Sequence, residues 1–359
     1  MASGAFGYVG YDMIQHIEPV EITGEDGLDV PEVLLVIPKV VVVFDHIFQE
    51  ILLIGRCEDN DIDAINFALD GVEDAPSANV DLMSNTSQAR YFEIVERCRE
   101  YIRAGDIFQV VPSQRLSTPF AYKSISFYRA LRRLNPSAFM FHMNLGEVRL
   151  VGSSPEILVR VRDGRVAIRP IAGTRPRSGD DVEDARRAAD LLADPKEAAE
   201  HLMLLDLGRN DVGRVSAYGS VEVTEQFIVE RYSHVMHIVS HVEGNLREGQ
   251  DAIDALFAGF PAGTVSGAPK IRAMQIIDEM ENHRRGIYGG AVGYFGWNGD
   301  LDTCIALRTA ILKDGQLHIQ AGGGVVLDSD PQYEYDETLH KAGALKRAAE
   351  LASSYEFDQ

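Results

Sequence analysis

Short apolar runs interrupted by proline or glycine are the feature that most constrains the fold of this 359-residue chain. Runs of this length with turn residues between them are typical of antiparallel strands joined by tight connections. Gly164 provides one such turn. The runs are Phe108–Val111, Phe139–Leu145, Val148–Gly152, Ile157–Val161 and Val166–Ile168, with two more at Gly289–Trp297 and Leu317–Val326. The sequence therefore predicts a large antiparallel sheet component.

Helical periodicity elsewhere in the chain predicts a second class of element. Apolar residues recur at helical spacing from Ser87 to Ala104, and Gly105 follows where a C-cap glycine would lie. The longest helical pattern runs from Asp180 to Leu207, and Pro195 predicts a break into two helices near Asp194. Further helices are predicted at Ala252–Phe257, Lys270–Glu281 and Glu337–Ala352. The predicted fold class is therefore α+β.

The whole chain, residues 1–359, is expected to form one domain, with an N-terminal region of about residues 1–84 before a catalytic core of about residues 85–352. β-branched residues from Val33 to Phe44, cut by Pro38, indicate buried strand, and the apolar pattern resumes from Phe48 to Ile54. Between residues 55 and 87 the sequence becomes acidic, so a helix followed by an exposed loop is expected there.

One internal similarity links the two ends of the chain. Gly4–Tyr11 resembles Gly289–Trp297 in its spacing of glycine and aromatic residues. A single pair of matches is weak support for a repeat. The similarity is either chance or a sign of two related strands that pack in mirrored positions.

Composition limits the possible classes of function. Lys and Arg number 34 against 55 Asp and Glu, and the net charge of -21 argues against general binding to nucleic acid or to an anionic membrane. An anionic substrate would need a local basic or metal-bearing pocket. Cys57, Cys98 and Cys304 lie far apart, so neither a disulfide framework nor a zinc knuckle is indicated. With no secretory leader or bilayer-length apolar run, a cytoplasmic location is expected.

Two groups of carboxylates are candidates for a metal site. Glu334 and Glu337 are three residues apart, which places both on one face of a helix, and Gly322–Gly324 lies just upstream. Glu200 precedes His201 and an apolar helical run. Oxygen ligands from separated helices suit Mg²⁺ better than Zn²⁺, which favours more His or Cys ligands. A solvated helix face is the alternative interpretation for each carboxylate.

The glycine-bearing segments Pro170–Pro176 and Pro261–Lys270 could present backbone N–H groups to an anion at a helix start, or could be plain loops. Neither has the spacing of a phosphate-binding Walker loop, and nucleotide binding is not supported. In Tyr232–His237, one of two histidines could face a pocket, although a lone histidine is more often a structural residue.

Seven motifs, taken together, have the pattern of one enzyme family. They are Gly105–Ser113, Ser153–Glu156, Pro170–Thr174, Glu200–His201, Leu205–Asp211, Pro261–Lys270 and Tyr288–Gly290. By these motifs the chain resembles the chorismate-utilising enzymes, and within them anthranilate synthase component I. The resemblance extends from about Gly4 to about Ala352 and implies two antiparallel sheets packed orthogonally, with helices outside and the active site between the sheets.

By these motif positions, the resemblance implies that Glu200 and Glu337 hold Mg²⁺, with Glu334 acting directly or through water. The metal would bind the ring carboxylate of chorismate. Glu156 matches the general acid that protonates the C4 hydroxyl, so it must hold a proton when substrate binds. We expect burial beside another negative group to raise its pKa.

The resemblance also implies a set of substrate contacts. Tyr288 and Arg308 match positions that bind the enolpyruvyl carboxylate, Arg308 through a charge-assisted pair. Glu156, Thr174 and His237 are the predicted catalytic residues, and His237 falls at the position associated with loss of pyruvate. The other pocket positions implied by the resemblance are Gly173, Gly322, Gly324 and Lys341.

Two positions distinguish the reactions of the family. Related enzymes carry a water-activating lysine where this chain has Gln109, or a lysine that attacks C2 covalently where it has Ala172. Direct attack by ammonia at C2 is therefore expected, giving anthranilate and pyruvate. Ammonia would come from a partner glutamine amidotransferase subunit, because no glutaminase segment is recognisable in this chain.

The family's usual N-terminal segment, which includes a tryptophan feedback motif, has no counterpart in the sequence, so tryptophan regulation is expected to be absent or impaired. Asn135–Met140 keeps part of the other wall of that inhibitor site. Two alternatives remain open: an aminodeoxychorismate-forming enzyme, and a non-catalytic remnant that binds chorismate or a partner.

Overall fold

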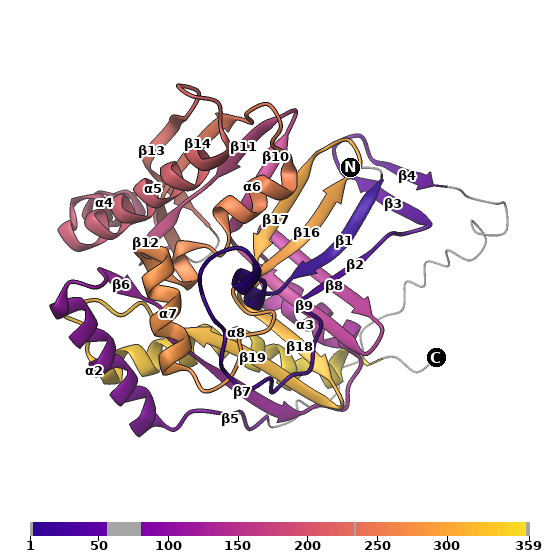
Figure 1. Cartoon of the computed structure of the whole chain (residues 1–359). Coiled ribbons are helices and arrows are strands. Elements are labelled where there is room, and N and C mark those ends of the chain that lie inside the picture. The colour runs from indigo at the N-terminus through magenta and orange to yellow at the C-terminus, as the bar shows by residue number, and fades with distance from the viewer. Residues whose placement is uncertain (1–2, 56–79, 233–234, 357–359) are drawn as a thin grey trace.

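The computed structural model describes residues 3–55, 80–232 and 235–356, and its largest layer is a nine-stranded antiparallel sheet (Figure 1). In chain order its strands are β1 (Gly4–Val9), β2 (Val33–Val36), β10 (Ile157–Arg162), β11 (Arg165–Ile168), β12 (Ile171–Pro176), β13 (Glu222–Arg231), β14 (Val235–Asn245), β16 (Ala291–Gly296) and β17 (Leu301–Ile305). Their order in space is β12-β14-β11-β10-β17-β16-β1-β2, and β13 also pairs with β14.

A second sheet has six antiparallel strands in the order β5-β7-β19-β18-β9-β8. These strands are β5 (Met83–Ser84), β7 (Ser113–Pro119), β8 (Phe139–Leu145), β9 (Val148–Ser154), β18 (Thr309–Lys313) and β19 (Gln316–Gly322). Two smaller pairs complete the strands described: β3 (Val40–Asp45) with β4 (Glu50–Gly55), and β6 (Gln109–Val110) with β15 (Gly267–Ala268).

Helices cover the outer faces of the two large sheets (Figure 1). Buried residues of α5 and α6 pack on the nine-stranded sheet, and those of α3 and α8 pack on the six-stranded sheet. The helices are α2 (Gln88–Ala104), α3 (Ser124–Leu134), α4 (Asp181–Ala193), α5 (Pro195–Val215), α6 (Ala252–Gly259), α7 (Lys270–Met280) and α8 (Pro331–Leu351), with 3-10 turns η1 (Tyr11–His16), η2 (Gly263–Val265) and η3 (Ala352–Tyr355).

The inner faces of the two sheets pack directly on each other. Tyr8, Val292 and Cys304 from the nine-stranded sheet share one buried cluster with Leu150 and Ile311 from the six-stranded sheet. Burial of such apolar faces is the main favourable term in folding. The predicted α+β fold of antiparallel sheets with outer helices is confirmed. Within the described residues, no helix is both long and apolar enough to cross a membrane.

Several local predictions are confirmed. Ser87 caps α2 by accepting a hydrogen bond from the Arg90 backbone N–H, and Gly105 follows as the C-cap. The break at Asp194 separates α4 from α5, because the Asp194 side chain caps α5 immediately before Pro195. The two similar glycine-aromatic segments are neighbours, since β1 pairs with β16 from Gly4 opposite Gly296 to Val9 opposite Ala291.

Other predictions were wrong. Pro170–Pro176 is neither a plain loop nor a helix start, because it forms β12. The segment from Val33 was predicted to be buried, yet Val33, Leu35 and Val36 are about two-fifths exposed, at 38%, 40% and 43%. The reason is that β2 is an edge strand. The helix expected after Gly55 falls on residues 56–79, which lie outside the described residues, as does Cys57.

The buried side chain of Arg285 links segments that are far apart in the sequence. Its side chain is 2% exposed, and it donates hydrogen bonds of 2.6 Å to the carbonyl oxygens of Val265 and Val111. Its Nη2 also lies 2.6 Å from Oε1 of Glu281, and its guanidinium stacks on Tyr288 with Cζ 5.4 Å from the ring centre. A buried cation needs this full set of partners, because its desolvation is otherwise very costly.

We predict that Arg285→Met lowers the free energy of unfolding by about 3–5 kcal/mol, because it leaves the Glu281 carboxylate buried without its cation. Chemical denaturation with urea measures this change. Arg347→Met is the matched control, since Arg347 pairs with Glu350 in an exposed position of α8 and such pairs contribute about 0–1 kcal/mol. Equal losses in the two variants would contradict the prediction.

Candidate active site

A pocket of about 480 Å³ draws its walls from both large sheets and from α5 and α8. All twelve residues predicted to act in catalysis, substrate binding or metal binding line it. These are Glu156, Gly173, Thr174, Glu200, His237, Tyr288, Arg308, Gly322, Gly324, Glu334, Glu337 and Lys341. The structure thus brings together residues that are up to 185 positions apart in the sequence, from Glu156 to Lys341.

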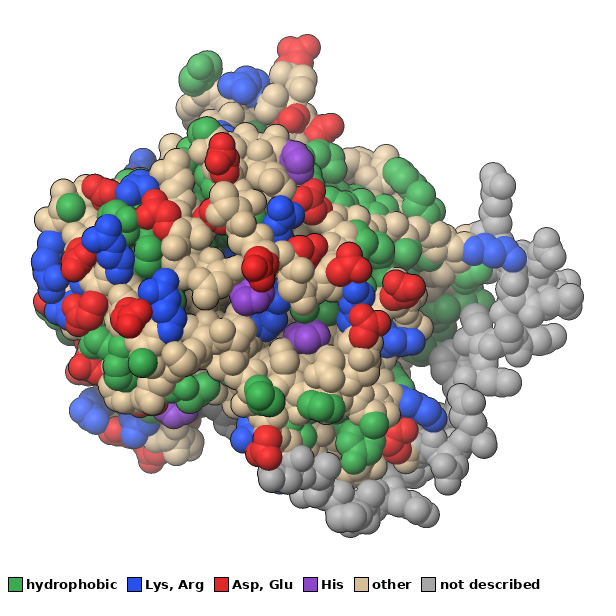
Figure 2. Space-filling view, turned by 60° about the horizontal axis from the view of Figure 1, so that its bottom comes forward, with side chains coloured by type: hydrophobic (Ala, Val, Ile, Leu, Met, Phe, Trp, Pro, Cys, Tyr) green, Lys and Arg blue, Asp and Glu red, His purple; other side chains and the backbone are tan. Residues whose placement is uncertain are grey.

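The pocket, like the surface, contains side chains of both charges. Acidic and basic side chains are interspersed over the face drawn in Figure 2, and the net charge of the chain is -21. The pocket is lined by the basic residues Lys196, Arg308 and Lys341 and by Glu156, Glu197, Glu200, Glu334 and Glu337. An anion can bind beside one of the basic side chains, because charges within a few ångströms act most strongly on a bound group.

Glu156 lies between β9 and β10 and is 9% exposed. Burial raises the pKa of its carboxyl to about 8, although the Thr264 hydrogen bond and the charges of Arg308 and Lys341 oppose this rise. The Thr264 hydroxyl donates to Oε1 of Glu156 at 3.1 Å. The negative neighbour expected from the sequence does not contribute, and burial is the cause of the shift. At neutral pH the carboxyl holds a proton that it can donate.

His237 faces a β-bulge. Ala172 pairs with Ile238 and Arg175 with Met236, so Gly173 and Thr174 of β12 lie opposite the single residue His237 of β14. A bulge of this kind redirects side chains beside a site. Gly173 has φ +67°, a conformation that residues with a Cβ rarely adopt, and an added Cβ would lie 3.0 Å from Oε2 of Glu197.

The bulge also sets the tautomer of His237. Nδ1 lies 2.8 Å from the carbonyl oxygen of Gly173 and 3.1 Å from Oγ1 of Thr174. A carbonyl oxygen only accepts, so Nδ1 carries the proton and Nε2 carries the lone pair. Burial lowers the pKa of His237, while the hydrogen bond to Gly173 works against that change. The ring is therefore a neutral base. His234, the other histidine of this segment, lies outside the described residues.

Arg308 has positive charge available for a ligand. Its φ of +47° places it in the left-handed region, where a residue other than glycine is uncommon. Burial lowers the pKa of its guanidinium, and Glu156 counteracts this. Within the described ranges, the guanidinium makes no hydrogen bond to protein, and Tyr288 lines the same pocket. An anionic group in the pocket would provide the missing partner.

Lys341 and the glycine segment form the opposite wall. Nζ of Lys341 donates to the carbonyl oxygen of Gly322 at 2.9 Å and lies 3.2 Å from Oε1 of Glu337. Gly324 packs against Gln109, whose Nε2 would be 2.8 Å from an added Cβ. A side chain at position 324 would therefore collide with Gln109 of β6.

The predicted metal ligands line one pocket but do not form a closed cage. Burial raises the pKa of Glu334 to about 7, and its Oε2 is buried without a hydrogen-bond partner in the described part of the chain. Burial also raises the pKa of Glu200, whose Oε1 accepts from Gln109 at 3.3 Å. Across residues 3–55, 80–232 and 235–356, no three His, Cys, Asp or Glu side chains are close enough to hold a metal ion by themselves.

This donor set nevertheless fits a hard cation. Mg²⁺ usually keeps several waters and takes only one or two protein carboxylates together with substrate oxygens. An orphaned carboxylate oxygen beside a second carboxylate is the kind of group that such an ion neutralises. His201 takes no part, because it is fully buried with Nε2 2.7 Å from Oγ of Ser240 and does not line the pocket. The assignment of Mg²⁺ stays a prediction.

Some pocket residues were missed from the sequence. Thr264 lies in a segment that had been singled out, but its contact with Glu156 spans 108 positions and leaves no local signal. Glu197 was detectable, since it precedes Glu200 by three residues and thus shares its helix face. Asn135–Ala138, identified only as part of an inhibitor site, also line this pocket.

Comparisons with known proteins identify the family of this chain. Residues 1–347 match the family described as chorismate binding enzyme. Anthranilate synthase component 1 of Cereibacter sphaeroides is 53% identical over 99% of this chain and 75% of its own length, and that of Pseudomonas putida is 50% identical over 97% and 75%. The crystal structure of component I from Streptococcus pneumoniae superposes with a TM-score of 0.89 at 42% identity, covering 96% of this chain and 80% of that one. The chain therefore belongs to the chorismate binding enzyme family.

Proposed function

We propose that the chain converts chorismate and ammonia to anthranilate, pyruvate and water. The observation that carries the proposal is the arrangement in one pocket of a protonated Glu156, a neutral His237 and an Arg308 guanidinium that has no hydrogen-bond partner among the described residues. This set can donate a proton, accept a proton and bind a carboxylate. The relatives named anthranilate synthase component 1 support this choice of reaction.

Substrate binding uses the charges in the pocket. Arg308 pairs with the enolpyruvyl carboxylate, and Tyr288 donates a hydrogen bond to it. Glu200, Glu334 and Glu337 would hold Mg²⁺, which when bound offsets the charge of the ring carboxylate. Lys341 neutralises part of the carboxylate cluster through Glu337. Binding thus orients the ring before any bond changes.

The first half of the reaction replaces the C4 hydroxyl. Glu156 gives its proton to the C4 oxygen, the C–O bond breaks and water leaves. Ammonia adds at C2 as the ring double bonds shift. The ammonium group that forms then releases one proton to solvent, from which Glu156 is reprotonated before the next turnover. The Thr264 hydroxyl keeps its hydrogen bond to Glu156 and stabilises the carboxylate that forms.

The second half forms the aromatic ring. Nε2 of His237 takes the proton from C2, the bond between C3 and the enolpyruvyl oxygen breaks, and the released enolate takes up a proton at its methylene carbon to become pyruvate. The Gly173 carbonyl stabilises the imidazolium through the Nδ1 proton. The bulge in β12 therefore supports the base during proton transfer.

Other family reactions need residues that are missing from the pocket wall. Gln109 and Ala172 line the pocket at the positions where the resemblance places nucleophile-activating or nucleophilic lysines. Neither side chain can act as a base or form a covalent bond to C2. Ammonia is therefore the nucleophile in this proposal, with formation of aminodeoxychorismate as the alternative that the product analysis below distinguishes.

The proposal includes a partner subunit and a cellular location. The names of the relatives, component 1, imply a second component, and a glutamine amidotransferase that supplies ammonia fits the reaction. Because the pocket uses both large sheets, we infer one catalytic domain for the chain. A cytoplasmic location remains part of the proposal.

The proposed reaction predicts anthranilate fluorescence from the purified chain with chorismate, Mg²⁺ and ammonium, and its loss on addition of EDTA. Glu337→Gln should abolish the metal-dependent signal while far-ultraviolet circular dichroism stays unchanged. A folded chain that produces another compound by chromatography, or none, would refute the proposal. Full activity in EDTA would refute the metal assignment alone.

Thr264→Val should extend activity to higher pH. Glu156 must be protonated, so kcat/KM falls as pH rises through its pKa of about 8. Thr264 lowers that pKa through its hydrogen bond, and removing the hydroxyl raises it. The alkaline limb of the pH profile of kcat/KM measures the shift. A limb that stays in place or moves to lower pH would show that Glu156 is not the titrating acid.

His237→Met should separate the two halves of the reaction. Without the base, anthranilate formation falls by about 10²–10⁴-fold, the usual contribution of a general base. Chorismate is still consumed, and the aminated intermediate builds up in a time course followed by mass spectrometry. Undiminished anthranilate formation would rule out the role given to His237.

A further inference from the structure

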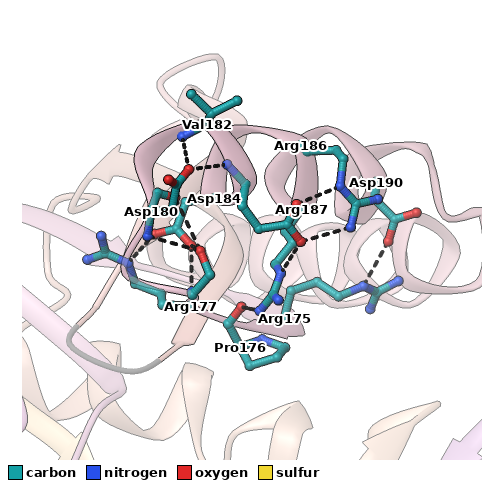
Figure 3. A network of polar contacts seen from close by, with 11 residues as sticks. Arg175, Pro176, Arg177, Asp180, Val182, Asp184, Arg186, Arg187 and Asp190 are labelled. Carbon is teal, nitrogen blue, oxygen red and sulfur yellow. Dashed lines mark hydrogen bonds and ion pairs between the residues drawn. The ribbon is translucent and has the colours of Figure 1, made fainter.

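Arg175 follows the Gly173–Thr174 bulge and contacts three carboxylates that lie outside its strand. Its guanidinium nitrogens are 3.1 Å from Asp190, 2.8 Å from Asp194 and 3.3 Å from Glu197. It also donates to the carbonyl oxygen of Thr174 at 3.1 Å. Figure 3 shows Arg175 within the polar network along α4. One side chain thus joins β12, α4 and the start of α5.

Asp194 connects Arg175 to the helix start. Its Oδ1 accepts from the backbone N–H groups of Lys196 and Glu197, at 2.9 Å and 3.3 Å, and so caps α5. Its Oδ2 accepts from Arg175. An N-cap side chain fixes the first turn of its helix. Because Arg175 holds the capping group itself, it also fixes where that turn lies relative to β12.

The first two turns of α5 carry pocket residues. Glu197 and Glu200 share one helix face, and both line the pocket. Oε1 of Glu197 accepts from Arg175, and its Oε2 lies on the other side, against the bulge at Gly173. The guanidinium also offsets one negative charge beside Glu200.

We propose that Arg175 is a positioning residue, which holds the first turn of α5 against the β12 bulge and thereby fixes Glu197 and Glu200 in the wall of the pocket. Its effect on turnover rests on the function proposed above. Its effect on the helix does not. Arginine suits this task because its planar fork of five donors serves several carboxylates at once.

Arg187 offers a matched comparison in the same network (Figure 3). It also ties α4 to the end of β12, by donating to the Pro176 carbonyl oxygen at 2.8 Å and pairing with Glu183 at 2.9 Å. Its side chain is 29% exposed against 23% for Arg175. Among the residues that the structure describes, none of its hydrogen bonds or ion pairs reaches α5 or the pocket. The two arginines are similarly exposed but contact different segments of the chain.

The test compares Arg175→Gln with Arg187→Gln by hydrogen–deuterium exchange of the free protein. Arg175→Gln should raise the rate of amide exchange in a peptide covering residues 195–205 by roughly tenfold or more, because the first turn of α5 loses its contacts with Arg175. Arg187→Gln should leave that peptide unchanged. Equal exchange in the wild type and Arg175→Gln would overturn the proposal.

Turnover gives the second measurement. With chorismate, Mg²⁺ and ammonium, Arg175→Gln should lower kcat/KM by roughly tenfold, or 1.4 kcal/mol, while Arg187→Gln stays within about twofold. Arg175→Lys should recover part of the loss, because an ammonium can still reach one carboxylate. Faster exchange with unchanged turnover would overturn the positioning role. If the wild type makes no anthranilate, the proposed function fails, and the exchange result still decides whether Arg175 anchors α5.

Discussion

The buried ion pair between Arg285 and Glu281 is the interaction on which the walls of the pocket depend. Arg285 holds the carbonyl oxygens of Val111 and Val265 and stacks on the ring of Tyr288, and all three of these residues line the pocket. Replacing a buried pair with apolar groups is often neutral for stability. In this protein the pair joins three segments that are distant in the sequence. One of them, the segment of Val265, places Thr264 beside Glu156.

Burial then shifts the pKa values of an acid and a base in opposite directions within one cavity. It raises the pKa of Glu156, so that the acid is neutral, and lowers the pKa of His237, so that the base is also neutral. Desolvation disfavours the charged form of either group. The result is a proton donor and a proton acceptor that coexist at the same pH. Arg308, which is charged and has no hydrogen-bond partner in the described residues, supplies the attraction for an anionic substrate.

The sequence was most informative where signals are local. Helix ends followed from Ser87, Gly105 and the Asp194–Pro195 pair, because caps act within a few residues. Strands β8–β11 followed from runs bounded by glycine or proline. By contrast, β12 was missed, since its Gly173–Thr174 bulge resembles a loop until His237 of β14 lies opposite. The site residues were predicted from the motif resemblance, which assigns roles to positions far apart in the sequence. The Thr264–Glu156 hydrogen bond was not predicted, because it depends on tertiary packing alone.

The most direct test of the account is a crystal structure of the Glu156→Gln variant with chorismate and Mg²⁺, in which the proton donor is removed but the shape of the pocket is kept. The account predicts the enolpyruvyl carboxylate at Arg308, the ring carboxylate toward Glu337 and the C4 hydroxyl at residue 156. A ring bound with its C4 hydroxyl away from residue 156, or chorismate bound outside this pocket, would contradict it.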